Sequence, residues 1–282
     1  MIPRPIAFIR VPKVYCPAHS LWHALAPLAG GILALAAAAV AAADPAPRPS
    51  PLKNGSEFQS AEVRALQSDD FANPMSLWIS RGEAVWSEAR GPQGKSCASC
   101  HGEAPRSMKG VTARYPRWDE SLRRVVNVEE RIQACSEAKQ GAGRFGDQSD
   151  ELVGLSAFIA LQSRGLPVSV SVAGAAQSTF EKGRALYFQR IGQMNLACTH
   201  CHDASWGRRL YAETVSQGHP TGWPAYRNEW QHPGTLERRL RACFFGVRAE
   251  LPRYGDPDMV ALELYLAWRA QGLPMEAPGV RR

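Results

Sequence analysis

The runs Cys97-Ala98-Ser99-Cys100-His101 and Cys198-Thr199-His200-Cys201-His202 are the most informative part of this 282-residue chain. The two thiols of a Cys-x-x-Cys-His run can add across the vinyl groups of one porphyrin, and the adjacent histidine then reaches the iron from one face. One copy is a moderately specific signal, whereas two copies in one chain are a strong one. We therefore predict two covalently bound haem c groups, attached by four cysteines and ligated by two histidines, which are Cys97, Cys100, Cys198, Cys201, His101 and His202.

Two other kinds of site also use paired cysteines. A zinc site would need both Cys-x-x-Cys pairs on one metal ion, but here each pair lies in its own half of the chain. A thioredoxin-type redox pair does not need the histidine that follows each motif. Both alternatives therefore fit the sequence less well than haem.

The chain repeats itself around the two motifs. The halves match at Gly82 with Gly183, at Cys97 with Cys198, at residues 131–135 with 239–243, and at residues 162–167 with 270–274. A repeat of this length indicates two copies of one folding unit. We predict a mainly α fold of two tandem class I cytochrome c-like domains, over 71–172 and 173–282, related by internal duplication.

Helical patterns dominate both halves. Ser149 can cap a helix that runs through Gln162, and Asp256 with the proline after it can start the counterpart in the second half. A further helix leading to Cys135 is expected from four apolar residues, which are Leu122, Val125, Val126 and Ile132. No segment shows a convincing alternating pattern typical of strands.

The opposite face of each iron needs a second ligand, which in ordinary electron-transfer cytochromes is methionine or histidine. The first half has no further histidine between His101 and residue 172, and Met108 lies too close to His101 to wrap the haem. Cys135 is therefore the leading ligand there by elimination. In the second half four residues stay eligible, which are His219, His232, Met259 and Cys243.

The repeat favours Cys243, because it occupies the position equivalent to Cys135. Met259 lies on the apolar face of the last helix, where its simpler role is to fill the core. Cys135 and Cys243 are also the two cysteines left over once haem has taken four, so a disulfide between them is an alternative in an oxidising compartment. That disulfide is disfavoured because Cys135 and Cys243 occupy equivalent positions in the two halves, so each is expected to face its own haem.

The first 43 residues have the three parts of a secretory signal, which are a basic start, an apolar stretch and small residues before a cleavage site. We predict cleavage near Ala43/Asp44, export to the periplasm, and an extended proline-rich segment over 44–70. Removing Arg4, Arg10 and Lys13 with the leader lowers the formal net charge from +7 to +4. This charge is dispersed and does not suggest a nucleic-acid partner. No later segment is long enough to span a membrane.

The run after the second motif resembles a known family. It consists of Arg239-Leu-Arg-Ala-Cys243-Phe-Phe-Gly-Val-Arg248-Ala-Glu-Leu-Pro252. Together with the Cys-x-x-Cys-His motif before it, this run resembles the SoxA family, the A subunits of the periplasmic SoxAX cytochrome complexes of thiosulfate oxidation. The similarity extends from about Phe71 to Pro274. Because both haem motifs and Cys135 are present, the chain resembles the diheme members of that family.

The resemblance implies an L-cysteine S-thiosulfotransferase that oxidatively joins thiosulfate to a cysteine of SoxY, held with SoxZ in the SoxYZ carrier. It also implies SoxX as the partner subunit, with a haem of its own, and a downstream cytochrome that accepts two electrons. Cys243 would then be both a ligand of the second iron and the catalytic cysteine, present as thiolate or persulfide. Arg239 would bind the substrate anion.

The chemistry of this run agrees with the resemblance. On a helix Arg239 and Cys243 stand at i and i+4, so they share one face. A guanidinium can bind a sulfonate through paired hydrogen bonds and favours a thiolate beside it. Arg248 can add a second positive group, whereas Arg241 points elsewhere and is expected to be solvated. The alternative function for these arginines is a basic docking face for an acidic partner, which we favour for Arg248 but not for Arg239.

Three rival functions stay open. A diheme electron-transfer cytochrome without substrate chemistry would need Met259 or a histidine on the second iron. A diheme peroxidase would need an open iron position and an acid–base group such as Glu229 or His232. A non-catalytic docking subunit would bind a sulfur carrier without turnover. The Arg-x-x-x-Cys run disfavours all three, and its match at Arg131 and Cys135 suggests an ancestral active site retained at the first haem.

Overall fold

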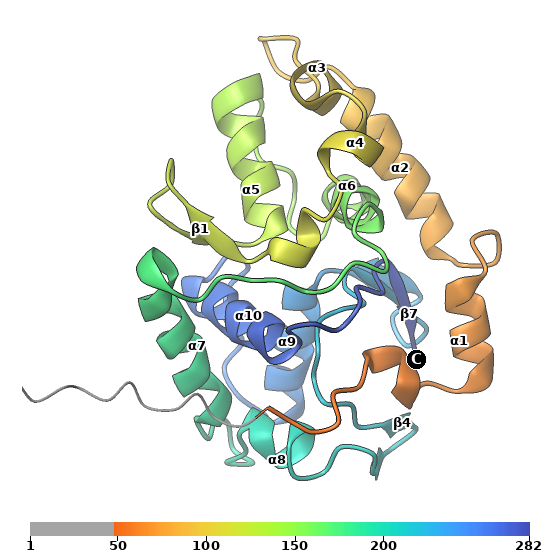
Figure 1. Ribbon diagram of the computed structural model, residues 1–282, viewed down its shortest axis with the longest axis vertical. Helices are drawn as coiled ribbons and strands as arrows, with labels where there is room; N and C mark the ends of the chain where they lie inside the picture. The colour runs from red at the N-terminus through yellow and green to blue at the C-terminus, as the bar shows by residue number, and fades with distance from the viewer. Residues whose placement is uncertain (1–47) are drawn as a thin grey trace, which may run out of the picture. The chain divides into compact units, whose positions relative to one another are not determined.

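The computed structural model describes residues 48–282, so the predicted signal sequence, its cleavage site and the start of the extended segment lie outside the described residues. Helices form most of the regular structure (Figure 1). They are α1 (Ala61–Ser68), α2 (Met75–Ser87), α3 (Cys97–His101), α4 (Ala104–Ser107), α5 (Val128–Cys135), α6 (Asp150–Leu161), α7 (Gln177–Phe188), α8 (Cys198–His202), α9 (Leu236–Gly246) and α10 (Pro257–Arg269). Short 3-10 helices are η1 (Gly55–Phe58), η2 (Thr112–Arg114) and η4 (Gly174–Ala176), and η3 (Ser136–Gln140) is a π-helical turn. The prediction of a mainly α fold is confirmed.

One pair of closely packed helices lies in each half. Helix α2 packs on α6, and α7 packs on α10. In the first pair, a Cβ atom added to Gly82 would lie 2.0 Å from the carbonyl oxygen of Gly154. In the second pair, a Cβ atom added to Gly183 would lie 1.9 Å from the carbonyl oxygen of Ala261. Only glycine allows the two backbones to approach so closely, which explains the matching glycines in the sequence.

The two C-terminal helices of the halves begin where the sequence predicts. Helix α6 begins after Ser149, whose side chain accepts a hydrogen bond from the backbone N–H of Leu152. Helix α10 begins after Asp256, whose side chain accepts from the N–H of Asp258, and Pro257 is its first residue. These caps satisfy backbone donors that a helix start leaves unpaired.

The predicted helix over Leu122 to Cys135 is wrong in its first half. Val125 and Val126 belong to a strand, and α5 begins only at Val128. Two causes act together: the valines are buried in a hairpin, and the side chain of Asn127 caps the helix by accepting from the N–H of Glu130. A residue that caps a helix cannot also lie inside it.

The structure also contains short strands, although the sequence predicted none. They are β1 (Arg117–Asp119), β2 (Arg124–Val126), β3 (Arg209–Leu210), β4 (Glu213–Thr214), β5 (Ala225–Arg227), β6 (His232–Gly234) and β7 (Gly279–Arg281). Strands β1 and β2 form an antiparallel hairpin before α5, and β5 and β6 form a corresponding hairpin before α9. Strand β7 pairs with β5 in parallel. Strands of two or three residues are too short to show the alternation that reveals a strand in sequence.

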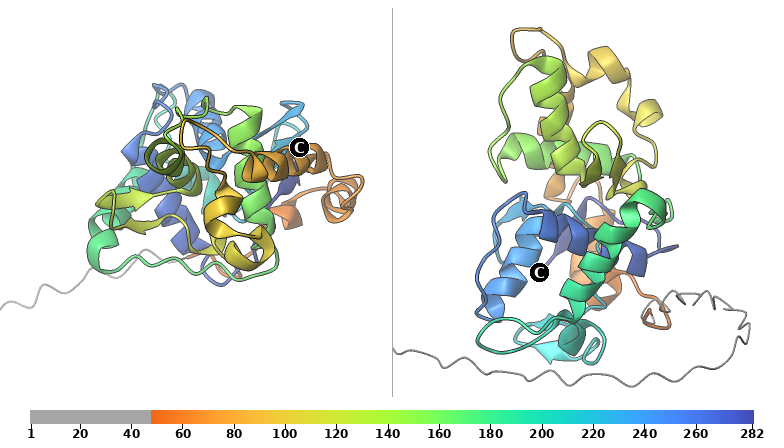
Figure 2. Two further views of the ribbon diagram at one scale, coloured as in Figure 1. Left: turned by 90° about the horizontal axis from the view of Figure 1, so that it is seen from above. Right: turned by 90° about the vertical axis from the view of Figure 1, so that its left-hand side faces the viewer.

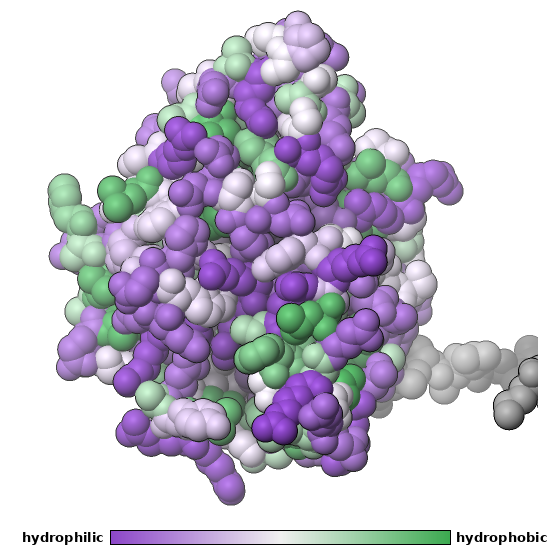
Figure 3. Space-filling model, turned by 180° about the vertical axis from the view of Figure 1, so that it is seen from behind, coloured by the Kyte–Doolittle hydropathy of each residue, from purple (hydrophilic) through white to green (hydrophobic). Residues whose placement is uncertain are grey.

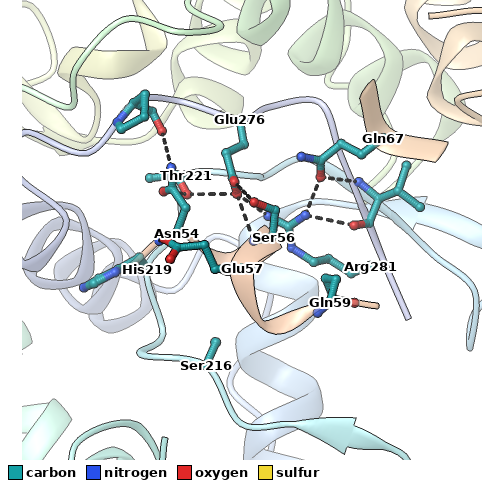
Figure 4. Close-up of polar contacts among 12 residues, drawn as sticks. Asn54, Ser56, Glu57, Gln59, Gln67, Ser216, His219, Thr221, Glu276 and Arg281 are labelled. Atoms are coloured by element: carbon teal, nitrogen blue, oxygen red, sulfur yellow. Dashed lines mark hydrogen bonds and ion pairs between the residues drawn. The ribbon is translucent and has the colours of Figure 1, made fainter. Parts of the chain in front are cut away.

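The segment before residue 70 is not simply extended, because η1 and α1 lie in it. It packs against the C-terminal end of the chain (Figure 4). The side-chain carbonyl of Gln67 accepts a hydrogen bond of 3.0 Å from the backbone of Val280, and Thr221 donates one of 2.8 Å to Asn54. Arg281 and Glu276 form a buried ion pair of 2.7 Å beside them. These partners explain why a proline-rich segment is ordered here.

The described residues 48–282 belong to one compact unit in which the two halves contact each other (Figure 2). The amide of Gln148 exchanges hydrogen bonds of 2.7 and 3.0 Å with Thr235, and Asn127 donates one of 3.0 Å to Glu263. The equivalent ends of the halves also meet, because Pro167 and Pro274 face each other in an antiparallel bridge. The hydrophobic core of the second half therefore includes side chains from the first.

The surface shows hydrophobic side chains in small separate groups among hydrophilic ones, at least on the face seen in Figure 3. Among the described residues 48–282, no helix has the length and apolar character needed to cross a membrane.

Candidate functional site

The second Cys-x-x-Cys-His motif forms the short helix α8, and the end of helix α9 lies beside it. Burial raises the pKa of the Cys198 thiol to about 12, and the nearby Cys243 adds to this rise. The pKa of Cys201 is raised by the same two causes in the same order. The structure therefore brings together the two attachment cysteines and Cys243, which lie more than 40 residues apart in sequence.

His202 is held in one orientation from its outer side. Its Nδ1 atom lies 2.7 Å from the backbone carbonyl oxygen of Ser216, so Nδ1 donates and Nε2 is the ring nitrogen that points away from this carbonyl. Gly218 stands next to the ring with φ +74°, and a Cβ atom there would lie 3.0 Å from Cγ of His202. This outer hydrogen bond is the arrangement typical of a metal-binding histidine, whose second nitrogen faces the metal.

The Cys243 thiol faces His202 from α9. Its pKa is about 7, below the usual value: burial raises it, but Arg239 and a hydrogen bond with His202 lower it further than burial raises it. Arg227 lowers it as well. The residue is only partly shielded from solvent. A thiol in such positive surroundings is a nucleophile and a metal ligand at neutral pH.

Arg239 lies one helical turn before Cys243, as the sequence predicts. Helix α9 begins after Thr235, whose side chain accepts from the N–H of Arg238. The nearby Cys243 raises the pKa of the Arg239 guanidinium more than burial lowers it. Its side chain is 30% exposed and lies 3.8 Å from a carboxylate oxygen of Glu213. The guanidinium is thus accessible and only loosely paired.

The other candidate ligands of the second iron have different partners. Met259 is 2% exposed and lies in the core. The Nδ1 atom of His219 lies 2.7 Å from the carbonyl oxygen of Lys53, and its Nε2 atom is buried without a hydrogen-bond partner among the described residues. His232 lies 3.0 Å from Asp150. Met259 and His232 are thus engaged elsewhere, and Cys243 is the candidate that makes a direct contact with His202.

The other two arginines of the run lie apart from the thiol. Arg241 stacks on the ring of Tyr254 at 4.3 Å, so it is not simply solvated. Arg248 is exposed and has a positive φ of 57° at the end of α9.

The first motif forms α3 and is more open. Cys100 and His101 are exposed, whereas Cys97 is partly buried. Burial raises the pKa of Cys97 to about 11, and the nearby Cys135 adds to it. The structure thus also brings Cys135 to its own motif. All six described cysteines are free, so Cys135 and Cys243 do not pair with each other.

The residues around the second motif fit a haem c group. Two thiols, the Nε2 atom of His202 and the thiol of Cys243 would supply the attachment and iron-ligand chemistry that such a group needs. Arg269 is fully buried and its Nη2 atom binds Asp203, the residue after His202. Its Nε and Nη1 atoms have no hydrogen-bond partner among the described residues. Such unpartnered donors suit the carboxylate of a bound porphyrin.

Sequence reasoning missed Arg227, Glu213 and Arg269. Arg227 is 3% exposed and binds both Glu213 and Glu229. A signal for it existed, because Arg227 precedes Arg239 by the same twelve residues by which Asp119 precedes Arg131. Glu213 and Arg269 show no such pattern, since only the folded chain brings them to the site.

A helical chain with a Cys-x-x-Cys-His helix, an oriented histidine and a thiol facing it is a c-type cytochrome, which binds haem covalently. Residues 81–168 match the family described as SoxA/TsdA, cytochrome c domain. The chain is 41% identical over 80% of its length to the L-cysteine S-thiosulfotransferase subunit SoxA of Pseudaminobacter salicylatoxidans, covering 79% of that protein. It is 39% identical to the Rhodovulum sulfidophilum SoxA subunit, over 82% of this chain and 80% of that one.

A solved structure agrees with these relatives. The crystal structure of SoxXA from P. pantotrophus matches with a TM-score of 0.79 and 36% identity, over 82% of this chain and 87% of the other. The chain belongs to the SoxA family of L-cysteine S-thiosulfotransferase subunits. The expected resemblance is confirmed.

Proposed function

We propose that this protein, together with a SoxX subunit, oxidatively couples thiosulfate to the carrier cysteine of SoxY in SoxYZ. The observation that carries the proposal is the Cys243 thiol, which faces His202 and has Arg239 one helical turn away. The curated relatives named as thiosulfotransferase subunits support it. The match to a SoxXA crystal structure supports SoxX as the partner.

The overall reaction balances as an oxidation. One carrier thiol and one thiosulfate dianion become a carrier S-thiosulfonate anion, one proton and two electrons. A sulfur–sulfur bond forms, and the S–H bond of the carrier breaks. A downstream cytochrome takes the two electrons. When bound, haem c supplies the one-electron acceptor chemistry that the reaction needs.

The residues of this chain have separate roles. The guanidinium of Arg239 binds the sulfonate oxygens of thiosulfate through charge-assisted hydrogen bonds. Cys243, as thiolate or persulfide, is the catalytic sulfur: a bond forms between it and the outer sulfur of thiosulfate as two electrons pass to the electron acceptor. The carrier thiolate then attacks that outer sulfur, takes over the whole thiosulfate group and releases the Cys243 sulfur as an anion. Nδ1 of His202 donates a hydrogen bond to the backbone carbonyl oxygen of Ser216, and this bond orients the ring so that Nε2 would hold the iron. Because Cys243 is partly exposed, a carrier arm can reach it.

The same proposal covers both halves. Cys97 with Cys100 and Cys198 with Cys201 would each attach one haem. His101 with Cys135 and His202 with Cys243 would hold the two irons. The two domains, 71–172 and 173–282, arose by internal duplication. Matching helix pairs, hairpins and motifs support this origin. Export to the periplasm by a signal sequence cleaved near Ala43 belongs to the same proposal.

Electron paramagnetic resonance of the ferric protein tests the ligand assignment. The parent protein is expected to give two thiolate-type low-spin signals, and the Cys243→Met variant one, because the second haem then loses its sulfur anion. Thiosulfate-dependent turnover with SoxX and SoxYZ is expected to vanish in that variant.

Met259→Leu is the matched control, because it alters a buried sulfur that we place in the core. It is expected to keep both signals and full turnover. If Cys243→Met keeps two thiolate signals, or if Met259→Leu loses one, the assignment of Cys243 is wrong and a diheme electron-transfer cytochrome fits better.

A further inference from the structure

The hairpins that lead into α5 and α9 have opposite charges at one equivalent position. Asp119 is the last residue of β1, and Arg227 is the last residue of β5. In each hairpin this residue pairs with the first residue of the next strand. Each precedes the arginine of the following Arg-x-x-x-Cys run by twelve residues, Arg131 or Arg239. The two positions are therefore equivalent in register, while their charges differ.

In the first half, the carboxylate of Asp119 binds the arginine directly. Its Oδ2 atom lies 3.0 Å from Nη1 of Arg131. The Asp119 side chain is 13% exposed and that of Arg131 is 37% exposed, so the carboxylate is largely covered while the guanidinium stays at the surface. The guanidinium one turn before Cys135 is thus already occupied by an internal anion.

In the second half, the carboxylate nearest to Arg239 is that of Glu213, and it is bound by a different arginine, Arg227. Glu213 on β4 binds Arg227 directly, while its other oxygen lies 3.8 Å from Nη2 of Arg239. That distance is beyond a hydrogen bond. Arg227 is almost fully buried and is itself fixed by Glu229 at 2.6 Å and by the face of Trp230. Glu213 is therefore bound more closely to Arg227 than to Arg239.

We propose that Arg227 is a positioning residue that holds Glu213 away from Arg239 and so keeps the Arg239 guanidinium available to the substrate anion. The inference rests on the proposed function, in which Arg239 binds thiosulfate. It also explains why a chain with two Arg-x-x-x-Cys runs has one site for the anion, because Asp119 occupies Arg131 in the other.

The test is a pair of substitutions in the assembled complex with SoxX, assayed with thiosulfate and SoxYZ. Arg227→Gln is expected to raise the KM for thiosulfate about tenfold with kcat within about threefold, because the released Glu213 then pairs with Arg239 and competes with substrate binding. Adding Glu213→Gln is expected to return KM to within about threefold of the parent value, because the competing charge is gone. Thiosulfate affinity measured by calorimetry without the carrier is expected to follow KM.

Three further variants complete the test. Arg238→Gln is the matched control: Arg238 stacks on the same Trp230 ring at 4.3 Å and is not among the ion-pair partners of Glu213. It is expected to leave KM unchanged. Arg227→Lys keeps the charge and is expected to rescue KM to within about threefold. Glu213→Gln alone is expected to lower KM or leave it unchanged, and it decides the matter if Arg227→Gln fails to fold.

Several results would overturn the inference. These are an unchanged KM in Arg227→Gln, a double variant as impaired as the single one, and a raised KM in Glu213→Gln. Arg239→Gln distinguishes a failure of the proposed anion site at Arg239 from a failure of the positioning role of Arg227. If that variant also leaves KM unchanged, the proposed anion site is wrong; if it raises KM while Arg227→Gln does not, only the role of Arg227 is wrong.

Discussion

Among single residues, His202 depends on neighbours outside its own motif. The carbonyl oxygen of Ser216 fixes its Nδ1 atom, and Gly218 leaves room for the ring. Gly218 also has φ +74°, a conformation that glycine adopts without strain. The orientation of this imidazole ring is therefore set by the loop that follows α8.

We expect Gly218→Ala to disturb the second haem site. The new methyl group would lie 3.0 Å from the imidazole and would also strain the backbone by about 1 kcal/mol. The second thiolate-type resonance signal should weaken at least several-fold while the first persists. Gly207→Ala is the control, because Gly207 has φ +83° but nothing within 4 Å of its Cβ position. Equal effects of the two substitutions would show that backbone strain alone acts.

The site residues whose chemistry is specific to their residue type could be predicted from the sequence. The residues that act only by pairing with other side chains of the site could not. Cysteines and histidines at fixed spacing, and an arginine one turn before a cysteine, form patterns that indicate their chemistry from the sequence. Glu213 and Arg269 are common residue types at positions without a pattern. Their roles follow from the ion pairs with Arg227 and Asp203, which exist only in the folded chain.

The helix pairs show how one small residue sets the position of a whole element. Helix α7 can approach α10 closely because Gly183 has no side chain. Helix α8 with the second motif follows directly after α7, so the same contact helps to position the motif.

Replacing Gly183 by alanine should destabilise the protein by about 3 kcal/mol or more, because its Cβ atom would lie 1.9 Å from the Ala261 carbonyl oxygen. Chemical denaturation followed by circular dichroism measures this loss. Gly246→Ala is the control on α9, where nothing lies within 4 Å. It should cost nothing, or stabilise by about 0.5–1 kcal/mol. A small loss at Gly183 would mean that the helix pair separates easily.

Capped helices were also predictable, whereas the hairpins were not. Ser149 and Asp256 predict the starts of α6 and α10, because capping residues and apolar periodicity are local sequence signals. The valines of β2 were assigned to a helix because their burial against β1 and the core is not local. The corresponding hairpin of β5 and β6 places Arg227 beside Glu213 and near Cys243.

In the molecule as a whole, the contact between the halves contains several buried carboxyl groups. Burial raises the pKa of Glu237 to about 7, and nearby Glu129 and Glu130 of the first half add to the rise. The pKa of Glu263 is raised well above its usual value by burial, with Glu129 and Glu237 close by. These groups favour their neutral forms in the folded protein.

This cluster predicts a loss of stability as pH rises. A carboxyl whose pKa is higher folded than unfolded binds more protons in the folded state, so stability falls between its usual pKa near 4.5 and the folded value near 7. For Glu237 the loss is at most ~3 kcal/mol. Glu237→Gln should therefore be more stable than the parent at pH 8, by a margin that shrinks toward pH 5.

Thermal or chemical unfolding of both proteins across this pH range measures that margin. Glu250→Gln removes one exposed charge and serves as the control. A margin for Glu237→Gln that does not change with pH would contradict the role assigned to the buried carboxyl.

The amino-acid order was enough to establish the mainly helical fold, the haem motifs, the Arg239–Cys243 pair and the family, because each depends on short-range spacing. Folding in three dimensions was needed to bring Cys243 to His202, to place Arg227 and Glu213 beside Arg239, and to occupy Arg131 with Asp119. These contacts join side chains from separate elements, and their strength depends on burial and distance. Neither quantity can be obtained from spacing along the chain.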